Sequence, residues 1–152
     1  MGPARDWMQM LIRRGNWQTY EEHAKLIREQ VFIQEQHIPD EDEWDAQDPI
    51  SEHFMVYLDG QPVATARLLP THKLGRVAVL KSYRGQGIGE ALMQDIIAKA
   101  QQQKRPFVKL SSQVHAVGFY SQLGFETQGE PYMDCDIPHI DMYLKLNSLS
   151  EL

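Results

Sequence analysis

Three glycines alternate in the segment RGQGIG, residues 84–89, and this pattern has the clearest chemical meaning in the chain. Glycine lets a backbone approach an anion closely because it has no Cβ. A helix N-terminus adds unpaired N–H groups and a partial positive charge, which together attract phosphate. A strand-like run lies just before these glycines, and an amphipathic pattern begins within them. The segment therefore predicts a pyrophosphate-binding turn between a strand and a helix.

Two other phosphate-binding motifs do not fit this segment. A P-loop needs Gly-Lys and then Ser or Thr, whereas Gly89 is followed by Glu90. The Rossmann fingerprint needs a glycine where Glu90 stands, and an acidic residue about 20 residues later in a βαβ unit. The simpler alternative is a glycine-rich turn that joins a strand to a helix and binds nothing.

The residues after the glycines predict the helix that such a turn requires. Apolar residues recur every four positions over residues 87–101 and form one stripe. The stripe consists of Ile88, Leu92, Ile96 and Ala100. Strands are expected on either side, over residues 75–80 and 107–111. A short helix is expected over residues 115–123, with Gly124 as its C-cap.

The flanking sequence indicates a mixed α and β domain. Thr19 is the expected N-cap of a first helix, which Pro39 ends. Its apolar residues at helical spacing are Ala24, Ile27, Val31 and Phe32. The other expected strands cover residues 8–13, 53–59, 62–69 and 140–146, with one more from Phe125 onward. The second and third of these meet at an Asp59-Gly60 turn, which is typical of a hairpin.

The bulk composition suits one soluble domain. The chain has 152 residues, and the domain is expected over residues 8–147, with flexible termini at 1–7 and 148–152. Hydrophobic residues make up 42% and charged residues 24%, which is ordinary for a globular protein. No apolar run reaches the roughly 20 residues of a membrane helix, so no membrane partner is expected. The single cysteine, Cys135, excludes an internal disulfide and favours a reducing, cytoplasmic setting.

The net charge of −6 is unevenly distributed. Residues 29–66 contain ten acidic residues and no Lys or Arg, whereas the rest holds the other 11 acidic residues and all 15 bases. A basic surface for nucleic acid is therefore not expected. The acidic part includes a loop or short irregular helix over residues 40–50, and we expect it to attract a cationic substrate. A solvated loop that only aids solubility is the alternative.

These motifs make the chain resemble the GNAT N-acetyltransferase superfamily. The family pattern Arg/Gln-x-x-Gly-x-Gly/Ala matches Arg84, Gly87 and Gly89. A second family feature is an aromatic pair before a Gly-Phe strand start, and it matches the run from Phe119-Tyr120 to Gly124-Phe125. The resemblance covers Leu11 to Leu146. Shorter phrases resemble the ElaA-type branch, namely Val31 to Gln36, Gly75 to Val77, Gln113 to His115 and Ile137 to Ile140.

The resemblance implies the GNAT acyl-CoA N-acyltransferase fold, of the α+β class. This fold has a central, mostly antiparallel mixed sheet of about seven strands flanked by about four helices. It implies acetyl-CoA as cofactor, with the pantetheine arm paired to backbone groups at Val77 and Val79. The implied cofactor-binding residues are Val77, Ala78, Val79, Arg84, Gly85, Gln86, Gly87, Ile88, Gly89, Gln113 and Phe119. Gln113 departs from the Asn that many members carry there.

The activity implied is transfer of acetyl from acetyl-CoA to a primary amine of a small molecule or peptide. An alkyl ammonium with a pKa of ~10.4 must first lose a proton, and the departing thiolate must gain one. By its match to the family, Tyr120 is the expected donor to the thiolate. Glu35 and His115 are also expected to be catalytic residues. The full set of candidates for the base is Glu35, Glu43, His53, His115 and His139.

Other functions stay open at this point. The chain could be a non-catalytic acyl-CoA-binding or sensing domain, or a module whose acidic stretch binds a basic protein; a homodimer also stays open. The six histidines are scattered and no Cys-x-x-Cys occurs, so a metal site is not expected. Cys135 is expected to be an inert thiol, and Trp44 to anchor its loop. Lys73 and Lys81 flank the glycine turn and could meet coenzyme phosphates.

Overall fold

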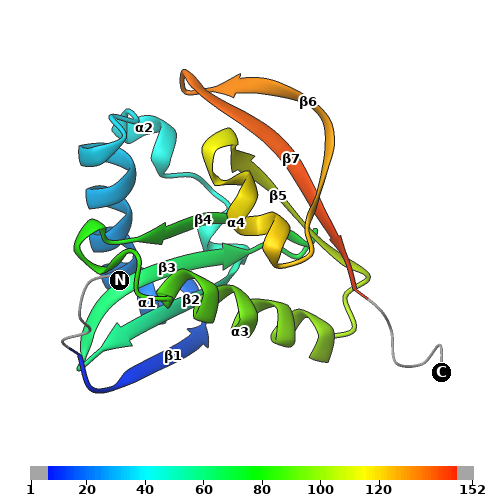
Figure 1. Ribbon diagram of the computed structural model, residues 1–152. Helices are drawn as coiled ribbons and strands as arrows, with labels where there is room; N and C mark the ends of the chain where they lie inside the picture. Colours follow the sequence, from blue (N-terminus) through cyan, green and yellow to red (C-terminus); the bar gives the residue numbers. More distant parts are fainter. Residues whose placement is uncertain (1–6, 147–152) are drawn as a thin grey trace.

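The chain folds around one seven-stranded mixed sheet (Figure 1). The computed structural model describes residues 7–146. In spatial order the strands are β1 (Met10–Gly15), β2 (Glu52–Leu58), β3 (Gln61–Leu68), β4 (Lys73–Val79), β5 (Phe107–Gln113), β7 (Ile137–Lys145) and β6 (Glu126–Asp134). Neighbouring strands run antiparallel apart from β4 and β5, which are parallel. The expectation of a mostly antiparallel mixed sheet is confirmed.

Helices pack on both faces of this sheet. They are α1 (Trp17–Arg28), the π-helix η1 (Glu29–Glu35), α2 (Asp40–Glu43), α3 (Ile88–Gln102) and α4 (Val117–Gln122), with single-turn 3₁₀ segments η2 (Asp48–Ile50), η3 (Lys81–Tyr83) and η4 (Val114–Ala116). Alternation along β2 shows how the faces divide. Phe54 and Val56 belong to the core cluster of α3, whereas Met55 between them packs with Ile27 of α1. β2 is therefore covered on both sides.

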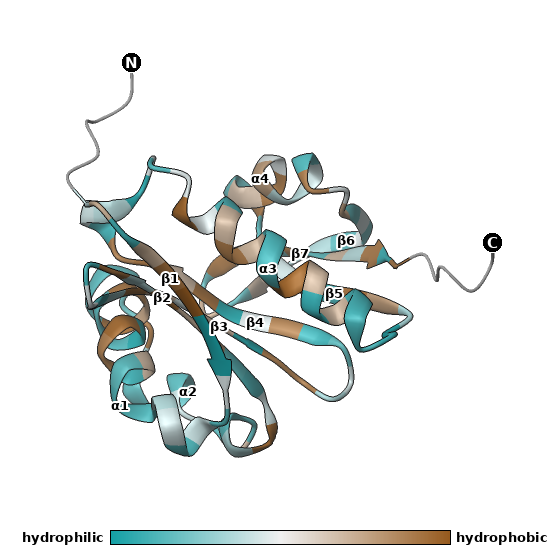
Figure 2. Cartoon of the chain, turned by 90° about the horizontal axis from the view of Figure 1, so that it is seen from below, coloured by the Kyte–Doolittle hydropathy of each residue, from teal (hydrophilic) through white to brown (hydrophobic). Residues whose placement is uncertain are grey.

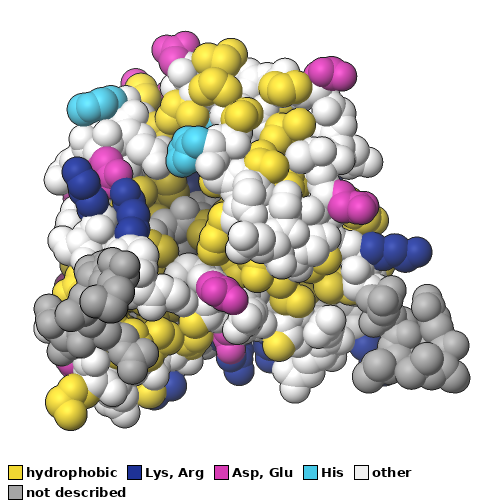
Figure 3. All heavy atoms as spheres, viewed as in Figure 1, with side chains coloured by type: hydrophobic (Ala, Val, Ile, Leu, Met, Phe, Trp, Pro, Cys, Tyr) yellow, Lys and Arg dark blue, Asp and Glu magenta, His cyan; other side chains and the backbone are white. Residues whose placement is uncertain are grey.

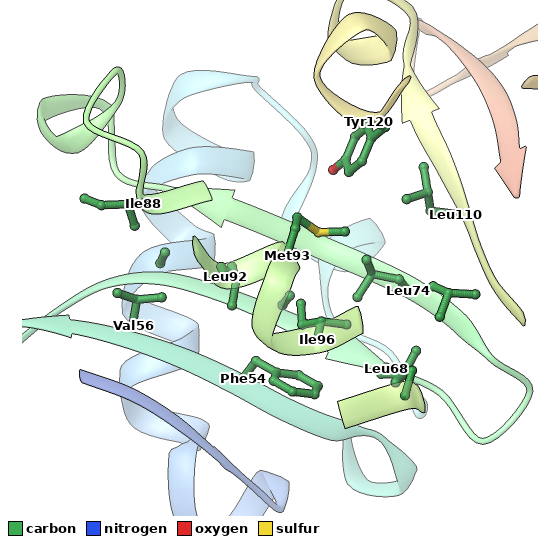
Figure 4. Close-up of a cluster of buried hydrophobic side chains, with 14 of the residues drawn as sticks. Phe54, Val56, Leu68, Leu74, Ile88, Leu92, Met93, Ile96, Leu110 and Tyr120 are labelled. Atoms are coloured by element: carbon green, nitrogen blue, oxygen red, sulfur yellow. The ribbon is translucent and has the colours of Figure 1, made fainter. Parts of the chain in front are cut away.

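The apolar stripe of α3 forms the centre of the larger core. Its four predicted members, Ile88, Leu92, Ile96 and Ala100, are each at most 1% exposed. Figure 4 shows Leu92 and Ile96 lying over β2, beside Val56 and Phe54. Burying one large aliphatic side chain contributes about 1.5–3 kcal/mol. The fourfold spacing in the sequence thus fixes which side of α3 meets the sheet, and with it the position of the turn that precedes the helix.

The first helix begins and ends differently from the prediction. Asn16 is the N-cap of α1, and its Oδ1 accepts a hydrogen bond from the Thr19 N–H at 2.8 Å. Thr19 already lies in the first turn, so its assignment as the cap was wrong. The helical segment also stops short of Pro39, because η1 ends at Glu35 and His37 has a left-handed φ of 60°. Pro39 instead precedes α2 as its N-cap.

Several turns follow the sequence closely. Asp59 and Gly60 have left-handed φ values of 48° and 84° and join β2 to β3, which is the backbone that a tight hairpin needs. Gly124, with φ of 102°, follows the end of α4 as predicted. The expected helix over residues 115–123 is split into η4 and α4, and most strand ends differ from the prediction by one to a few residues.

The two parallel strands separate soon after they meet. β4 and β5 pair at Lys73 with Lys109 and at Leu74 with Leu110, and no further pairing joins their described residues. On its other side β4 contains a β-bulge, where the register with β3 shifts between Thr65 and Arg67. A bulge bends a strand and increases its twist. β4 therefore turns away from β5 and leaves a gap in the sheet.

β6 forms one edge of the sheet and is exposed along its whole length. Its residues are pale to hydrophilic in Figure 2. The register with β7 shifts between Gln128 and Tyr132, and Gly129 in this interval has a left-handed φ of 80°. The β6–β7 hairpin turn, Cys135 and Asp136, reaches toward α2, since Cys135 Sγ lies 4.0 Å from Oδ2 of Asp42. The hairpin therefore overhangs the gap between β4 and β5.

The predicted flexible termini, residues 1–7 and 148–152, lie outside the described residues apart from Trp7. None of the described helices combines the length and the apolar composition that a bilayer crossing requires.

Candidate active site

A cavity of about 940 Å³ opens where β4 and β5 separate. Its wall comprises β4, the glycine turn after it, the end of β5, and α4. Residues of η1, α2 and the β6–β7 hairpin complete the lining. Figure 3 shows this face hollowed, with Lys and Arg side chains together on one rim. Such a volume suits a cofactor or small-molecule site.

The glycine turn forms one end of the cavity. Gly87 is the N-cap of α3, with a left-handed φ of 82°, and a Cβ built on it would meet no atom within 4 Å. A Cβ on Gly89 would lie 3.4 Å from the ring of Phe119. The backbone here is thus open to a ligand at one glycine and packed at the next. An N-cap without a side chain, at the start of a helix of 15 residues, fits an anion such as a pyrophosphate.

The structure gathers nearly all the residues expected to bind coenzyme. Those that line the cavity are Val77, Ala78, Val79, Arg84, Gly85, Gly87, Ile88, Gly89, Gln113 and Phe119. Gln86 lies outside the lining, because its side chain accepts a hydrogen bond from Trp7 Nε1 at 2.9 Å and donates to the Ser82 carbonyl. Lys73 lines the cavity and Lys81 does not.

The backbone of β4 faces the cavity at Val79. Leu80 donates its N–H to the Val63 carbonyl on β3 at 2.9 Å, so the alternating ladder turns the backbone groups of Val79 away from β3. The Val79 carbonyl accepts a hydrogen bond from Arg84 Nε at 2.9 Å. A ligand lying along β4 would meet polar backbone here, as in strand addition.

Arg84 binds Glu35 of η1 through both of its terminal nitrogens. The two distances are 2.6 and 2.7 Å, the geometry of a bidentate guanidinium–carboxylate pair. Hydrogen bonding from Arg84 holds the pKa of Glu35 below its ordinary value. The structure therefore brings Glu35 into the cavity wall but leaves it a weak proton acceptor in this state.

Tyr120 is buried in the cavity wall. Its ring packs edge-on against Phe119 and Phe125, and the residue is 9% exposed. Figure 4 shows its hydroxyl pointing from α4 toward β4. Burial raises the pKa of Tyr120 to about 12, because the charged phenolate loses hydration. The hydroxyl is thus protonated at neutral pH and can act as a donor.

A chain of hydrogen bonds sets the tautomer of neutral His115. Gln113 Nε2 donates to Oε1 of Gln36 at 2.9 Å. Oε1 of Gln113 is then the acceptor for His115 Nε2, which lies 2.7 Å away. This arrangement places the proton of neutral His115 on Nε2 and leaves Nδ1 with a lone pair. His115 lines the cavity, so Nδ1 could accept a proton there.

The remaining candidates for the base differ in their placement. His139 also lines the cavity, and because its Nδ1 lies 2.7 Å from the Ile137 carbonyl and carries the proton of the neutral ring, its Nε2 keeps a lone pair. His53 lies outside the cavity lining, where Nε2 contacts the Asp48 carbonyl, and burial lowers its pKa. Glu43 lines the cavity but is held in ion pairs.

Arginines from outside the acidic segment neutralise part of it, which the sequence did not reveal. The stretch itself contains no base, but arginines from α1, β3 and β4 pair with the buried Glu43 and Asp48 and with the exposed Asp45. The ion pairs join Arg28 to Glu43 and Asp48, Arg67 to Asp45 and Asp48, and Arg76 to Glu43 and Asp45. Asp40, Glu41 and Asp42 stay exposed, and Asp42 lines the cavity.

Two further residues from the sequence take structural positions. Trp44 lies outside the lining and its ring covers the Arg28 guanidinium, 5.0 Å away, so it anchors the acidic loop as expected. Cys135 is exposed, and burial together with the charges of Asp134 and Asp42 raises the pKa of its thiol. Within residues 7–146, no group of three or more His, Cys, Asp or Glu side chains is arranged to hold a metal ion.

Comparison with known proteins agrees with this geometry. The family model described as "Acetyltransferase (GNAT) domain" matches residues 17–146. The uncharacterized N-acetyltransferase YjcF of Bacillus subtilis (strain 168) is 36% identical over 123 residues, covering 78% of this chain and 88% of that protein. The uncharacterized protein YyaT of the same organism is 35% identical over 139 residues, covering 88% and 94%.

Solved structures give the same result. An acyl-CoA N-acyltransferase from Pseudomonas aeruginosa superimposes with a TM-score of 0.81 at 30% identity, covering 90% of this chain and 99% of that one. Escherichia coli ElaA superimposes with a TM-score of 0.82 at 26% identity, covering 90% and 100%. With a family model that spans most of its length and a matching fold, the chain belongs to the GNAT acetyltransferase superfamily.

Proposed function

We propose that this GNAT acetyltransferase moves an acetyl group from acetyl-CoA to a primary amine of a small molecule or peptide. The observation that carries the proposal is one cavity that joins the glycine turn to the Tyr120 hydroxyl. The turn supplies backbone N–H groups for the pyrophosphate. The opened edge of β4 supplies backbone partners for the pantetheine amides. The thioester would then lie near Tyr120, farther along the same cavity.

In this proposal the neutral amine attacks the thioester carbonyl directly. The C–N bond forms, the C–S bond breaks, and coenzyme A leaves as a thiolate. Tyr120 gives its proton to the sulfur and later regains one from solvent. Burial raises the pKa of Tyr120, which by itself would make the hydroxyl a weaker acid. The same burial destabilises the thiolate and so raises its affinity for the proton. Burial therefore raises the proton affinity of both the donor and the acceptor, so proton transfer between them stays possible.

The amine needs a separate proton acceptor. At pH 7 only about one alkyl amine in a few thousand is neutral, a deficit of roughly 4–5 kcal/mol. We assign this role to Nδ1 of His115, directly or through water, because hydrogen bonding through Gln113 keeps its proton on Nε2. His139 is the second candidate, because its Nε2 keeps a lone pair, whereas Glu35 would first have to leave Arg84.

The exposed acidic residues of α2 support a cationic acceptor. Asp40, Glu41 and Asp42 remain after the arginines have neutralised the rest of the loop. Their field would attract an ammonium to the cavity mouth. One cysteine in 152 residues supports a reducing, cytoplasmic setting.

Thiol release from acetyl-CoA tests the proposal, with a panel of tyramine, spermidine and a lysine-containing peptide as acceptors. Tyr120→Phe keeps the ring and its packing, so coenzyme affinity should change little. Turnover should fall ~10²-fold if the hydroxyl protonates the thiolate. Near-normal turnover in Tyr120→Phe would remove it from the mechanism. Tight binding of coenzyme A without thiol release from any amine would instead favour the non-catalytic acyl-CoA-binding domain.

A further inference from the structure

β4 carries an unusual residue at the point where it leaves β5. Arg76 has a left-handed φ of 52°, a region that a bulky residue rarely occupies. It lies in the β-bulge, where Arg76 and Val77 together stand opposite Ala66. The last pair between β4 and β5, Leu74 with Leu110, is only two positions earlier. Strained conformations of this kind persist where their surroundings enforce them, and they cluster at functional sites.

The side chain of Arg76 is tied to the acidic loop beside the cavity. Its Nε lies 3.1 Å from Oε2 of Glu43, close enough for an ion pair but poorly aligned for a hydrogen bond. Its Nη2 lies 3.3 Å from Oδ2 of Asp45 and donates to the Glu43 carbonyl at 3.0 Å. Asp45 also accepts from Arg67 on β3, at 2.7 and 2.9 Å. Asp45 therefore clamps the two strands on either side of the bulge.

The clamp is anchored in the interior of the protein. Glu43 also binds Nε of Arg28 at 2.8 Å, and the two side chains are 2% and 1% exposed. Asp48 joins Arg28 to Arg67 at 2.8 and 2.9 Å. Exposed ion pairs hold little in place, because water competes for both charges. These charges are removed from water, and an exchange of partners would leave a buried charge unpaired.

We propose that Arg76 is a positioning residue for acyl transfer: its ion pairs with the acidic loop hold the β4 bulge, so that the backbone from Val77 to Val79 meets the acyl-pantetheine arm in one register. The inference rests on the proposed function, because it concerns the same cavity. A misplacement of about 1 Å can lower a rate ~10²-fold while the ligand still binds. A purely stabilising Arg76 would instead change the melting temperature and leave kcat unaltered.

Arg76→Ala and Arg76→Lys test the kinetic consequence. Arg14→Ala is the matched control, because Arg14 forms an exposed ion pair with Asp95 outside the cavity. With the best amine of the panel, we expect kcat for thiol release to fall ~10- to 100-fold in Arg76→Ala. Lysine should restore part of it, because it keeps the charge without the fork that spans two carboxylates. Values of kcat within about twofold of wild type in both Arg76 variants would overturn the proposal.

A readout that needs no acceptor separates this inference from the proposed function. In ¹H–¹⁵N spectra of the wild type, acetyl-CoA should shift the amide signals of both Gly87 and Val77. In Arg76→Ala the Gly87 shift should persist and the Val77 shift should be lost. If the wild type shows no shift, acetyl-CoA is not the ligand and both ideas fail. If Val77 shifts equally in both proteins, only the role of Arg76 fails; should Arg76→Ala not fold, Arg76→Lys decides the comparison.

Discussion

Gly87 offers a sharp test of where the coenzyme phosphates bind. It has a φ of 82°, and a Cβ placed on it would meet no atom within 4 Å. Since Gly87 lines the cavity, a methyl group there can obstruct a ligand without disturbing the packing of the free protein. Gly60, in the β2–β3 turn, has a φ of 84° and equally open surroundings but lies outside the lining. Gly60→Ala therefore carries the same backbone strain without the proposed obstruction.

The two substitutions should cost the same stability. A left-handed alanine costs about 1–2 kcal/mol, partly offset by the lower entropy of the unfolded chain, about 0.4–1 kcal/mol. The net loss of about 1 kcal/mol corresponds to a melting temperature lower by roughly 2–4 °C in a protein of this size. Only Gly87→Ala should also bind acetyl-CoA more weakly. Losing one hydrogen bond to a charged phosphate costs about 1.5–3 kcal/mol, or roughly 10- to 150-fold in Kd.

Thermal unfolding and calorimetry with acetyl-CoA measure both effects. Equal melting temperatures for Gly87→Ala and Gly60→Ala would show that strain has been matched. A Kd for Gly87→Ala equal to that of Gly60→Ala would refute the placement of phosphate at this turn. A weakened Kd in both variants would trace the effect to lost stability, and the reasoning from open space at Gly87 would fail.

Two further predictions concern the acidic loop. Hydrogen bonding from Arg67 is the main cause that lowers the pKa of Asp45 from 3.8 to about 2, so Asp45 stabilises the fold above its unfolded pKa and ceases to do so as pH falls through the folded value. The difference in free energy of unfolding between wild type and Asp45→Asn should be full above about pH 5 and lost by about pH 2; a constant difference across this range would contradict the assignment. Separately, the triple variant Asp40→Asn, Glu41→Gln, Asp42→Asn should lower kcat/KM for a cationic amine and flatten its decline with salt through ~0.1 M, where the Debye length is ~10 Å. Equal salt slopes in the wild type and the triple variant would show that the loop is only a solvated surface. Glu43 is not substituted, because its charge pairs with Arg28 and Arg76.

Features that depend on neighbouring residues could be predicted from the sequence. The stripe of α3 repeats every four positions, so its buried side follows from local spacing. Asp59-Gly60 predicts its own turn, because both residues tolerate the left-handed region. The alternating glycines predict an open helix start for the same kind of reason. Even here one local prediction failed: Thr19 was expected as the N-cap, whereas Asn16, another residue type that caps helices well, takes that position.

Features made by distant residues could not be predicted in this way. Arg76 meets Glu43 across 33 positions, and Arg84 meets Glu35 across 49. No periodicity relates such partners, so the acidic stretch looked unneutralised and Glu35 looked free to act as a base. The bulge at Arg76 was hidden as well, because left-handed backbone is signalled in a sequence mainly by glycine or asparagine. The sequence therefore predicted which residues line the cavity better than it predicted their ion-pair partners.

The interruption in β6 bears on how this protein behaves at high concentration. An exposed edge strand offers free N–H and C=O groups on which a strand of another molecule can assemble. In β6 the register shift surrounds the left-handed Gly129 and Pro131, which has no N–H to donate. An incoming strand would find residues 126–128 or 132–134 before meeting the interruption, fewer than the ~5–6 residues of an ordinary strand. The edge is thereby a poor template for aggregation, although every residue along it faces water.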